Sequence, residues 1–132
     1  MAEANIKIEL KSNIDTVWKI VTDNENYAWR SDIKRIAVSE NENQFVEYTN
    51  DGFATTFSIT KKEEKKQYEF DMSNKNMKGH WTGVFRELSG GTEIDFREEV
   101  SANNPIMNLF VGSYLKKQQK QYLNDLKKVL CE

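Results

Sequence analysis

The order of strand-like and helix-like segments constrains this chain more than any single motif. A short helical segment follows the first strand, strand-like segments fill roughly residues 33–100, and a long helical segment closes the sequence. The closing segment starts at Asn104–Pro105, a favoured N-cap followed by a favoured first helical residue, and runs to about Leu130. A curved antiparallel sheet around such a helix can enclose a hollow, so a small-molecule cavity is the leading expectation.

Alternating apolar and polar residues predict the strands. Ile6, Ile8 and Leu10 alternate with charged residues, and Asn50–Asp51–Gly52 is a strong hairpin signal. Ser12 stands three residues before Asp15, which resembles a capping box and predicts a helix start there. A second short helical turn is expected at residues 27–29. The pattern therefore indicates an α+β domain.

The predicted strand at residues 77–88 places two glycines on its inward face. Gly79, Trp81 and Gly83 share one parity, and His80 shares the other. Glycine in a strand marks a bulge or a close approach of other groups, and it also removes volume that a ligand can occupy. Both interpretations of the two glycines remain open.

Aromatic side chains supply most of the predicted cavity wall. The candidates are Phe53, Phe57, Tyr68, Phe70, Trp81, Phe85 and Phe96 from the strands, Phe110 and Tyr114 from the closing helix, and Trp29 at the entrance. The closing helix carries apolar residues on two nearly opposite sides, with Gly112 between them. A bend at Gly112 is expected to let both groups bury, with the first turns at the cavity mouth.

Glu98 is a charged residue at a strand position that is predicted to face inward. It shares parity with Ile94, Phe96 and Val100, so it should face inward, where an ionised carboxylate is costly and often functional. The alternative, which its place near a strand end favours, is a slip or bulge that turns it to solvent. If it faces inward, Glu98 is the candidate catalytic residue, as a general acid or base.

The composition of the chain limits the classes of partner and cofactor that can be expected. A chain of 132 residues is enough for one domain. With 19 basic and 21 acidic residues the net charge is -2, so neither nucleic acid nor an anionic membrane surface is expected as a partner. The chain has no dinucleotide fingerprint, P-loop, nucleophile elbow or zinc-ligand spacing, so no cofactor and no metal are expected.

The same reasoning predicts the compartment. Cys131 is the only cysteine, which rules out an internal disulfide and fits a reducing environment. The sequence shows no signal peptide and no apolar stretch of membrane-spanning length. We expect a cytoplasmic protein without an integral membrane segment, as a monomer or a weak homodimer.

Several strings resemble the START-like, helix-grip superfamily (SRPBCC), specifically its polyketide cyclase/dehydrase and lipid-transport branch. They are residues 12–18, 21–23 and 26–29 at the start, 79–83 and 90–92 in the strands, and 122–127 in the closing helix. The resemblance covers essentially the whole chain. It implies a seven-stranded curved antiparallel sheet that grips the C-terminal helix, two short helices after the first strand, a ligand cavity between sheet and helix, and no cofactor.

Residues 1–132 are therefore expected to form a single START-like ligand-binding domain. The first functional hypothesis is binding, or transport, of a small hydrophobic or amphipathic molecule. The second is a cyclase/dehydrase-like enzyme that uses Glu98, and the third is a protein-interaction module. An inward cluster of several polar groups would favour the enzyme, whereas a large exposed apolar patch would favour the module.

Overall fold

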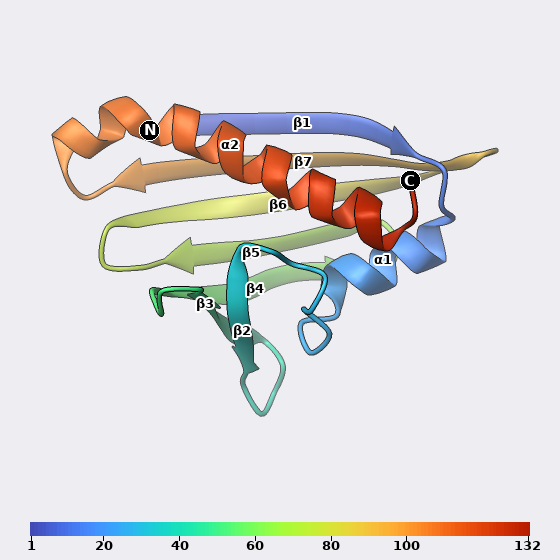
Figure 1. The fold of residues 1–132 in the computed structure, drawn as a ribbon, viewed down its shortest axis with the longest axis horizontal. Helices are drawn as coiled ribbons and strands as arrows, with labels where there is room; N and C mark the ends of the chain where they lie inside the picture. Colours follow the sequence, from blue (N-terminus) through green and yellow to red (C-terminus); the bar gives the residue numbers. More distant parts are fainter.

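The computed structural model describes residues 1–132 as one curved sheet and two helices (Figure 1). The elements in chain order are β1 (Ala2–Leu10), α1 (Ile14–Thr22), β2 (Ile33–Val38), β3 (Gln44–Thr49), β4 (Ala54–Glu63), β5 (Gln67–Ser73), β6 (Met77–Leu88), β7 (Gly91–Ala102) and α2 (Pro105–Val129). All seven strands pair antiparallel in the order β1-β7-β6-β5-β4-β3-β2. The predicted helix-grip architecture is confirmed.

Helix α1 and the turn after it carry the chain from one edge of the sheet to the other. The helix begins after Asn13, whose side-chain oxygen accepts a hydrogen bond from the Thr16 amide at 2.9 Å. The predicted cap at Ser12 is one residue early, because the Ser12 amide and hydroxyl donate to the Glu132 carboxylate instead. The expected second short helix is a single turn, closed by the Arg30 amide on the Tyr27 carbonyl at 2.9 Å.

Helix α2 is continuous and lies across β1 and β7 (Figure 1). Asn104 caps it as predicted, accepting from the Ile106 amide at 2.8 Å. The expectation that both apolar groups of this helix bury is wrong: Ile106, Leu109 and Phe110 are 69%, 78% and 67% exposed. The first turns project past the end of β7, so no sheet lies beneath them to receive these side chains. Neither helix is long and apolar enough to cross a membrane.

The main core lies between α1, the sheet and the second half of α2. Val17, Ile94 and Leu126 are fully buried there. Trp18 packs edge-on against Phe85 with ring centroids 4.9 Å apart. Burying side chains of this size stabilises the fold by about 1.5–3 kcal/mol each, so this core holds α1 and α2 on the same face of the sheet.

Gly83 is a position of close packing. A Cβ atom added there would overlap the indole ring of Trp81 and lie 3.2 Å from the Phe96 ring. At Gly79 it would lie 2.5 Å from the carbonyl oxygen of Glu99 and 2.7 Å from Val100. Of the two interpretations that the sequence leaves open, close approach therefore holds at both glycines.

We expect Gly83→Ala to lower the free energy of unfolding by about 1–3 kcal/mol, because the added methyl group must displace the packed indole ring. Gly112→Ala is the matched control: nothing lies within 4 Å of a Cβ there, and alanine favours a helix interior by up to about 1 kcal/mol. Urea unfolding should give opposite signs for the two variants. Equal, small effects would mean that the space beside Trp81 is empty.

Candidate functional site

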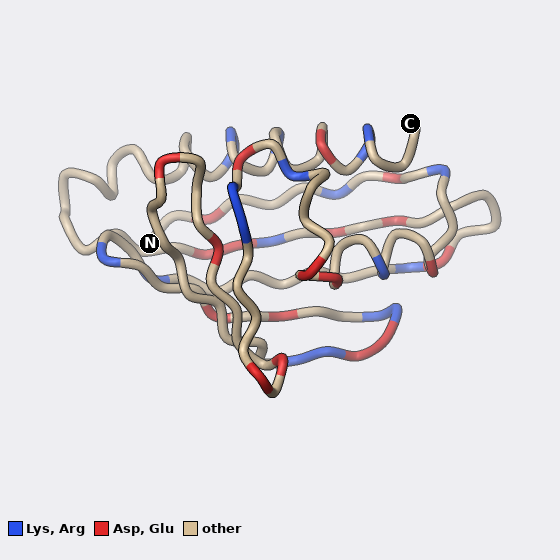
Figure 2. Tube along the Cα trace, turned by 60° about the horizontal axis from the view of Figure 1, so that its bottom comes forward, with Lys and Arg blue, Asp and Glu red and all other residues tan.

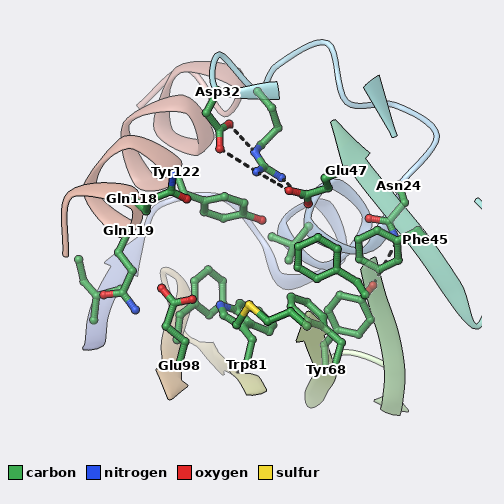
Figure 3. Close-up of a pocket in the computed structure, with 17 residues that line it drawn as sticks. Asn24, Asp32, Phe45, Glu47, Tyr68, Trp81, Glu98, Gln118, Gln119 and Tyr122 are labelled. Atoms are coloured by element: carbon green, nitrogen blue, oxygen red, sulfur yellow. Dashed lines mark hydrogen bonds and ion pairs between the residues drawn. The ribbon is translucent and has the colours of Figure 1, made fainter. Parts of the chain in front are cut away.

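A cleft lies between α2 and the curved face of the sheet. It consists of two hollows of about 140 Å³ and about 110 Å³. The hollows adjoin, since both are lined by Asp32, Glu47, Phe57, Met72, Glu98 and Gln118. Figure 3 shows the first hollow, with the sheet side chains on one side and those of α2 and the β2 region on the other.

The sheet side of the first hollow is an aromatic floor. Alternate residues of β3 to β7 point toward α2, so large rings from neighbouring strands meet there. Phe70 stacks on Trp81 with centroids 4.8 Å apart, and Phe45 stacks on Phe57 at the same separation. Phe96 lies 4.8 Å from the other side of Trp81. Because these rings pack on one another, the floor keeps its shape without a ligand.

Arg30 dominates the opposite side, the roof. Its guanidinium makes two hydrogen bonds of 3.0 Å to Asp32 and two of 3.4 Å to Glu47, and it lies 4.9 Å over the ring of Tyr122. The Arg30 side chain is only 12% exposed. Desolvation lowers the pKa of Arg30, but the charges of Glu47 and Asp32 outweigh it, so the net shift is upward. The cation is permanent and fully paired.

Tyr122 brings a polar group of α2 into the hollow. Figure 3 shows its hydroxyl in the interior of the cavity, where it makes no hydrogen bond to the protein. Burial raises the pKa of Tyr122, so the phenol stays neutral and can donate as well as accept. Gln119, one turn earlier, is held in place because its amide donates to the Ala4 carbonyl at 3.1 Å.

Glu98 faces inward beside Trp81. The two residues pair directly in the β6–β7 ladder, whose register is unbroken from Met77 to Leu88. The alternative of a slip or bulge that turns Glu98 to solvent is therefore wrong. Its carboxyl lines both hollows and makes no hydrogen bond or ion pair. Desolvation raises the pKa of Glu98 to about 7.

Seven of the ten aromatic residues predicted for the wall line the cleft. Those in the first hollow are Phe57, Tyr68, Phe70, Trp81 and Phe96. Phe53 and Tyr114 line the second hollow, together with Phe57. Period-two alternation predicted the strand residues because the face that a side chain takes is a local property of a strand.

Three predicted residues lie elsewhere. Phe85 has the correct parity, but it sits at the end of the sheet that α1 covers, so it belongs to the core. Trp29 packs edge-on against Tyr122 at 5.3 Å and does not reach the hollow. Phe110 lies on the exposed first turns of α2.

Sequence reasoning missed the polar roof. The residues concerned are Asn24, Arg30, Asp32, Glu47, Gln118, Gln119 and Tyr122. Glu47 shares its strand parity with Phe45, and Gln119 and Tyr122 share the helix face of Leu115 and Leu123, so periodicity could have found these three. No local pattern places Arg30, which lies in a turn. No group of three or more His, Cys, Asp or Glu side chains is placed to bind a metal ion.

The sheet, the long helix across it and the cleft between them define a START-like domain, and solved structures support that class. A START superfamily protein from Mycobacterium smegmatis is 15% identical, with a TM-score of 0.83 over 97% of this chain and 96% of that one. A conserved protein from Geobacillus kaustophilus is 11% identical, with a TM-score of 0.82 over 98% and 95%. The di-domain ARO/CYC BexL from the BE-7585A biosynthetic pathway is 14% identical, with a TM-score of 0.80 over 97% of this chain and 46% of BexL.

The sequence itself gives the family. Residues 1–130 match the family described as polyketide cyclase / dehydrase and lipid transport, and the chain belongs to that family. A comparison with curated proteins finds no match to this sequence. Because one fold of this kind supports many functions, the cleft itself must carry the functional argument.

We expect Glu98 to make the protein less stable as the pH rises from about 4.5 to about 7. The unfolded chain releases the Glu98 proton near 4.5 and the folded protein near 7, so the folded state binds more protons between these values. Glu98→Gln removes this dependence. Above pH 7 the variant should exceed wild type in unfolding free energy, by up to ~3 kcal/mol.

Urea unfolding across this pH range tests the expectation. His80 is a second titratable group whose pKa is shifted in the folded protein, so the quantity to follow is the difference between wild type and Glu98→Gln. On the outer sheet face, desolvation lowers the pKa of His80, but hydrogen bonds of 2.7 Å to Asp71 and Glu69 raise it overall. A difference that does not change with pH would show that Glu98 is solvated or paired.

Proposed function

We propose that the protein binds a small neutral molecule with an aromatic or alicyclic body and at least one hydroxyl or carbonyl group. One observation carries the proposal: an aromatic floor faces two part-buried polar groups that have no partner in the protein, the Tyr122 hydroxyl and the Glu98 carboxyl, and their oxygens are accessible from the cleft. A ligand that hydrogen-bonds to these oxygens gains about 0.5–1.5 kcal/mol for each bond. The packed rings of the floor offer a continuous apolar surface to the body of such a ligand.

The volume of the cleft sets the size of the ligand. An apolar cavity of ~150 Å³ in another protein holds one benzene molecule. The hollows of about 140 Å³ and about 110 Å³ therefore suit about one ring each. Because they adjoin at Phe57 and Met72, we expect a ligand of about two fused rings or a short chain that spans both.

The charges of the cleft disfavour anionic ligands. Arg30 is the only cation that lines the first hollow, and it is paired with both Asp32 and Glu47. These three groups together carry one net negative charge. Lys78 reaches the second hollow, but it is exposed, so its attraction for an anion is screened by water. A fatty acid or a sulfonate would lose hydration in the first hollow without gaining a free cation. Of the hydrophobic and amphipathic ligands expected from the sequence, the cleft favours a neutral, amphipathic one.

The remaining parts of the proposal come from the sequence. We place the protein in the cytoplasm, where its exposed cysteine, Cys131, would stay reduced. A monomer or a weak homodimer would suffice, since the cleft is complete within one chain.

Two naphthalene probes of nearly equal size test the charge preference. 2-Naphthol should bind and change the fluorescence of Trp81, whereas naphthalene-2-sulfonate should bind at least roughly tenfold more weakly, a difference of ~1.4 kcal/mol. Tyr122→Phe should weaken 2-naphthol binding severalfold by removing one hydrogen bond. Tyr48→Phe is the matched control, because Tyr48 lies under Arg35 and lines neither hollow. Tighter binding of the sulfonate, or equal effects of the two tyrosine variants, would contradict the proposal.

A second candidate function is proton-transfer catalysis by Glu98. A carboxyl with a pKa of about 7 can act as a base or an acid at neutral pH, and this one is unpaired and open to the cleft. The Glu98 carboxylate would remove the proton α to a ligand carbonyl, leaving the C–H electron pair in an enolate. The protonated carboxyl would then return a proton to carbon or oxygen. The family description, polyketide cyclase / dehydrase, agrees with such chemistry.

2-Tetralone, a neutral two-ring ketone, provides the test for this candidate. In deuterated water the protein should accelerate exchange of the α-protons, with a rate that rises through a pKa of about 7, and Glu98→Gln should abolish the effect. NMR follows the exchange directly. If 2-tetralone binds but exchanges at the buffer rate, the enzyme candidate fails and the binding function stands.

A further inference from the structure

The first turns of α2 present apolar side chains to solvent. The exposed large apolar residues there are Ile106, Met107, Leu109, Phe110 and Tyr114. On the opposite side of the same turns, Val111 and Leu115 are buried against Ala4 and Val100. The helix is therefore seated on the sheet by one face, while the other face carries a concentrated apolar surface. Such clusters usually mark an interaction site.

The rest of the outer face of α2 is basic. Its lysines are Lys116, Lys117, Lys120, Lys127 and Lys128, all exposed and none in an ion pair. Asp125 is the only acidic residue of the helix, and it is buried, with its carboxylate bound by Ser31. Figure 2 shows the blue positions spaced along the helix after an uncharged beginning. The net charge of -2 therefore conceals a local positive surface.

We infer that the outer face of α2 docks on an anionic membrane surface. The apolar first turns would enter the boundary between headgroups and acyl chains, and the lysines would contact the anionic headgroups. A helix that combines an apolar part with a lysine-rich polar face has the composition of interfacial segments, and each lysine near an anionic surface strengthens binding. The inference departs from the expectation based on overall composition, because net charge does not show how the charges are distributed along α2.

The charge pattern also argues against a second copy of this chain as the occupant. An isologous contact in which the two α2 helices run parallel would set the lysines of one α2 against those of the other. Nothing acidic on the outer face of α2 would offset that repulsion. Anionic headgroups complement both the charge and the exposed apolar side chains. Docking would also bring the second hollow close to the lipid surface, since Tyr114 belongs to both.

Sedimentation with lipid vesicles tests the inference. The full chain should bind vesicles of equal parts phosphatidylglycerol and phosphatidylcholine, should not bind vesicles of phosphatidylcholine alone, and should be released by high salt. The double variant Leu109→Ser, Phe110→Ser should reduce binding at least roughly tenfold. The triple variant Lys116→Gln, Lys117→Gln, Lys120→Gln should reduce it by roughly fivefold per lysine.

Matched variants on other surfaces control for exposure and charge. Val84→Ser removes an exposed apolar residue from the outer sheet face, and Lys61→Gln, Lys62→Gln, Lys66→Gln removes the same charge from the β4–β5 hairpin. Neither should change vesicle binding. All the variants should retain 2-naphthol binding, which separates a failure of docking from a failure of the proposed ligand function.

Three results would overturn the inference. One is no binding of wild type to anionic vesicles at low salt, and another is equal binding to both kinds of vesicle. The third is light scattering that shows a stable wild-type dimer which Leu109→Ser, Phe110→Ser converts to a monomer. That outcome would assign the apolar surface to self-association.

Discussion

The buried guanidinium of Arg30 is the interaction on which the cleft depends. It joins the turn before β2 to Glu47 on β3 and to the ring of Tyr122 on α2. A buried charge is stable only when it is paired, so Asp32 and Glu47 must remain in place around it. The roof is thus a polar bridge of fixed size instead of a layer of interdigitating apolar side chains, and an open space remains between it and the aromatic floor. Ser31 strengthens the bridge by donating to Asp125 of α2 at 2.9 Å.

Most side chains that line the cleft already make their packing contacts and hydrogen bonds within the protein. The aromatic rings of the floor pack on one another, and most roof groups are bonded to neighbours in the protein. Tyr122 and Glu98 are left with unused polar atoms facing the hollow. A site arranged in this way is preorganised, so little ordering is required when a ligand binds. The Glu98 carboxyl that favours a hydrogen-bonding ligand can also transfer a proton near neutral pH. Whether the site only binds or also catalyses would therefore depend on whether the ligand has an acidic proton, such as one α to a carbonyl.

Helix α2 serves different purposes along its length because its first turns lie beyond the end of β7. Its second half buries Leu123 and Leu126 in the core and contributes Tyr122 to the roof. Its first turns have no strand below them and expose residues such as Leu109 and Phe110. The predicted burial of both apolar groups failed for this reason. The length of a helix is a property of the sequence, but how far it projects past a sheet depends on where the strands end.

The sequence by itself determined the succession of strands along the chain and the capped start of α2 at Asn104. It left the direction of Glu98 open, and the unbroken pairing of β6 with β7 decided that this side chain faces inward. Strand alternation and capping depend on neighbouring residues only, so local patterns are sufficient for them. Tertiary structure alone decided the polar roof, because Arg30, Glu47 and Tyr122 come from three distant segments that meet only in the folded chain. It also decided the role of Gly83, which alternation placed on the inner face. Whether that space holds a ligand or the indole ring of Trp81 depends on the packing of side chains across strands, which no local pattern contains.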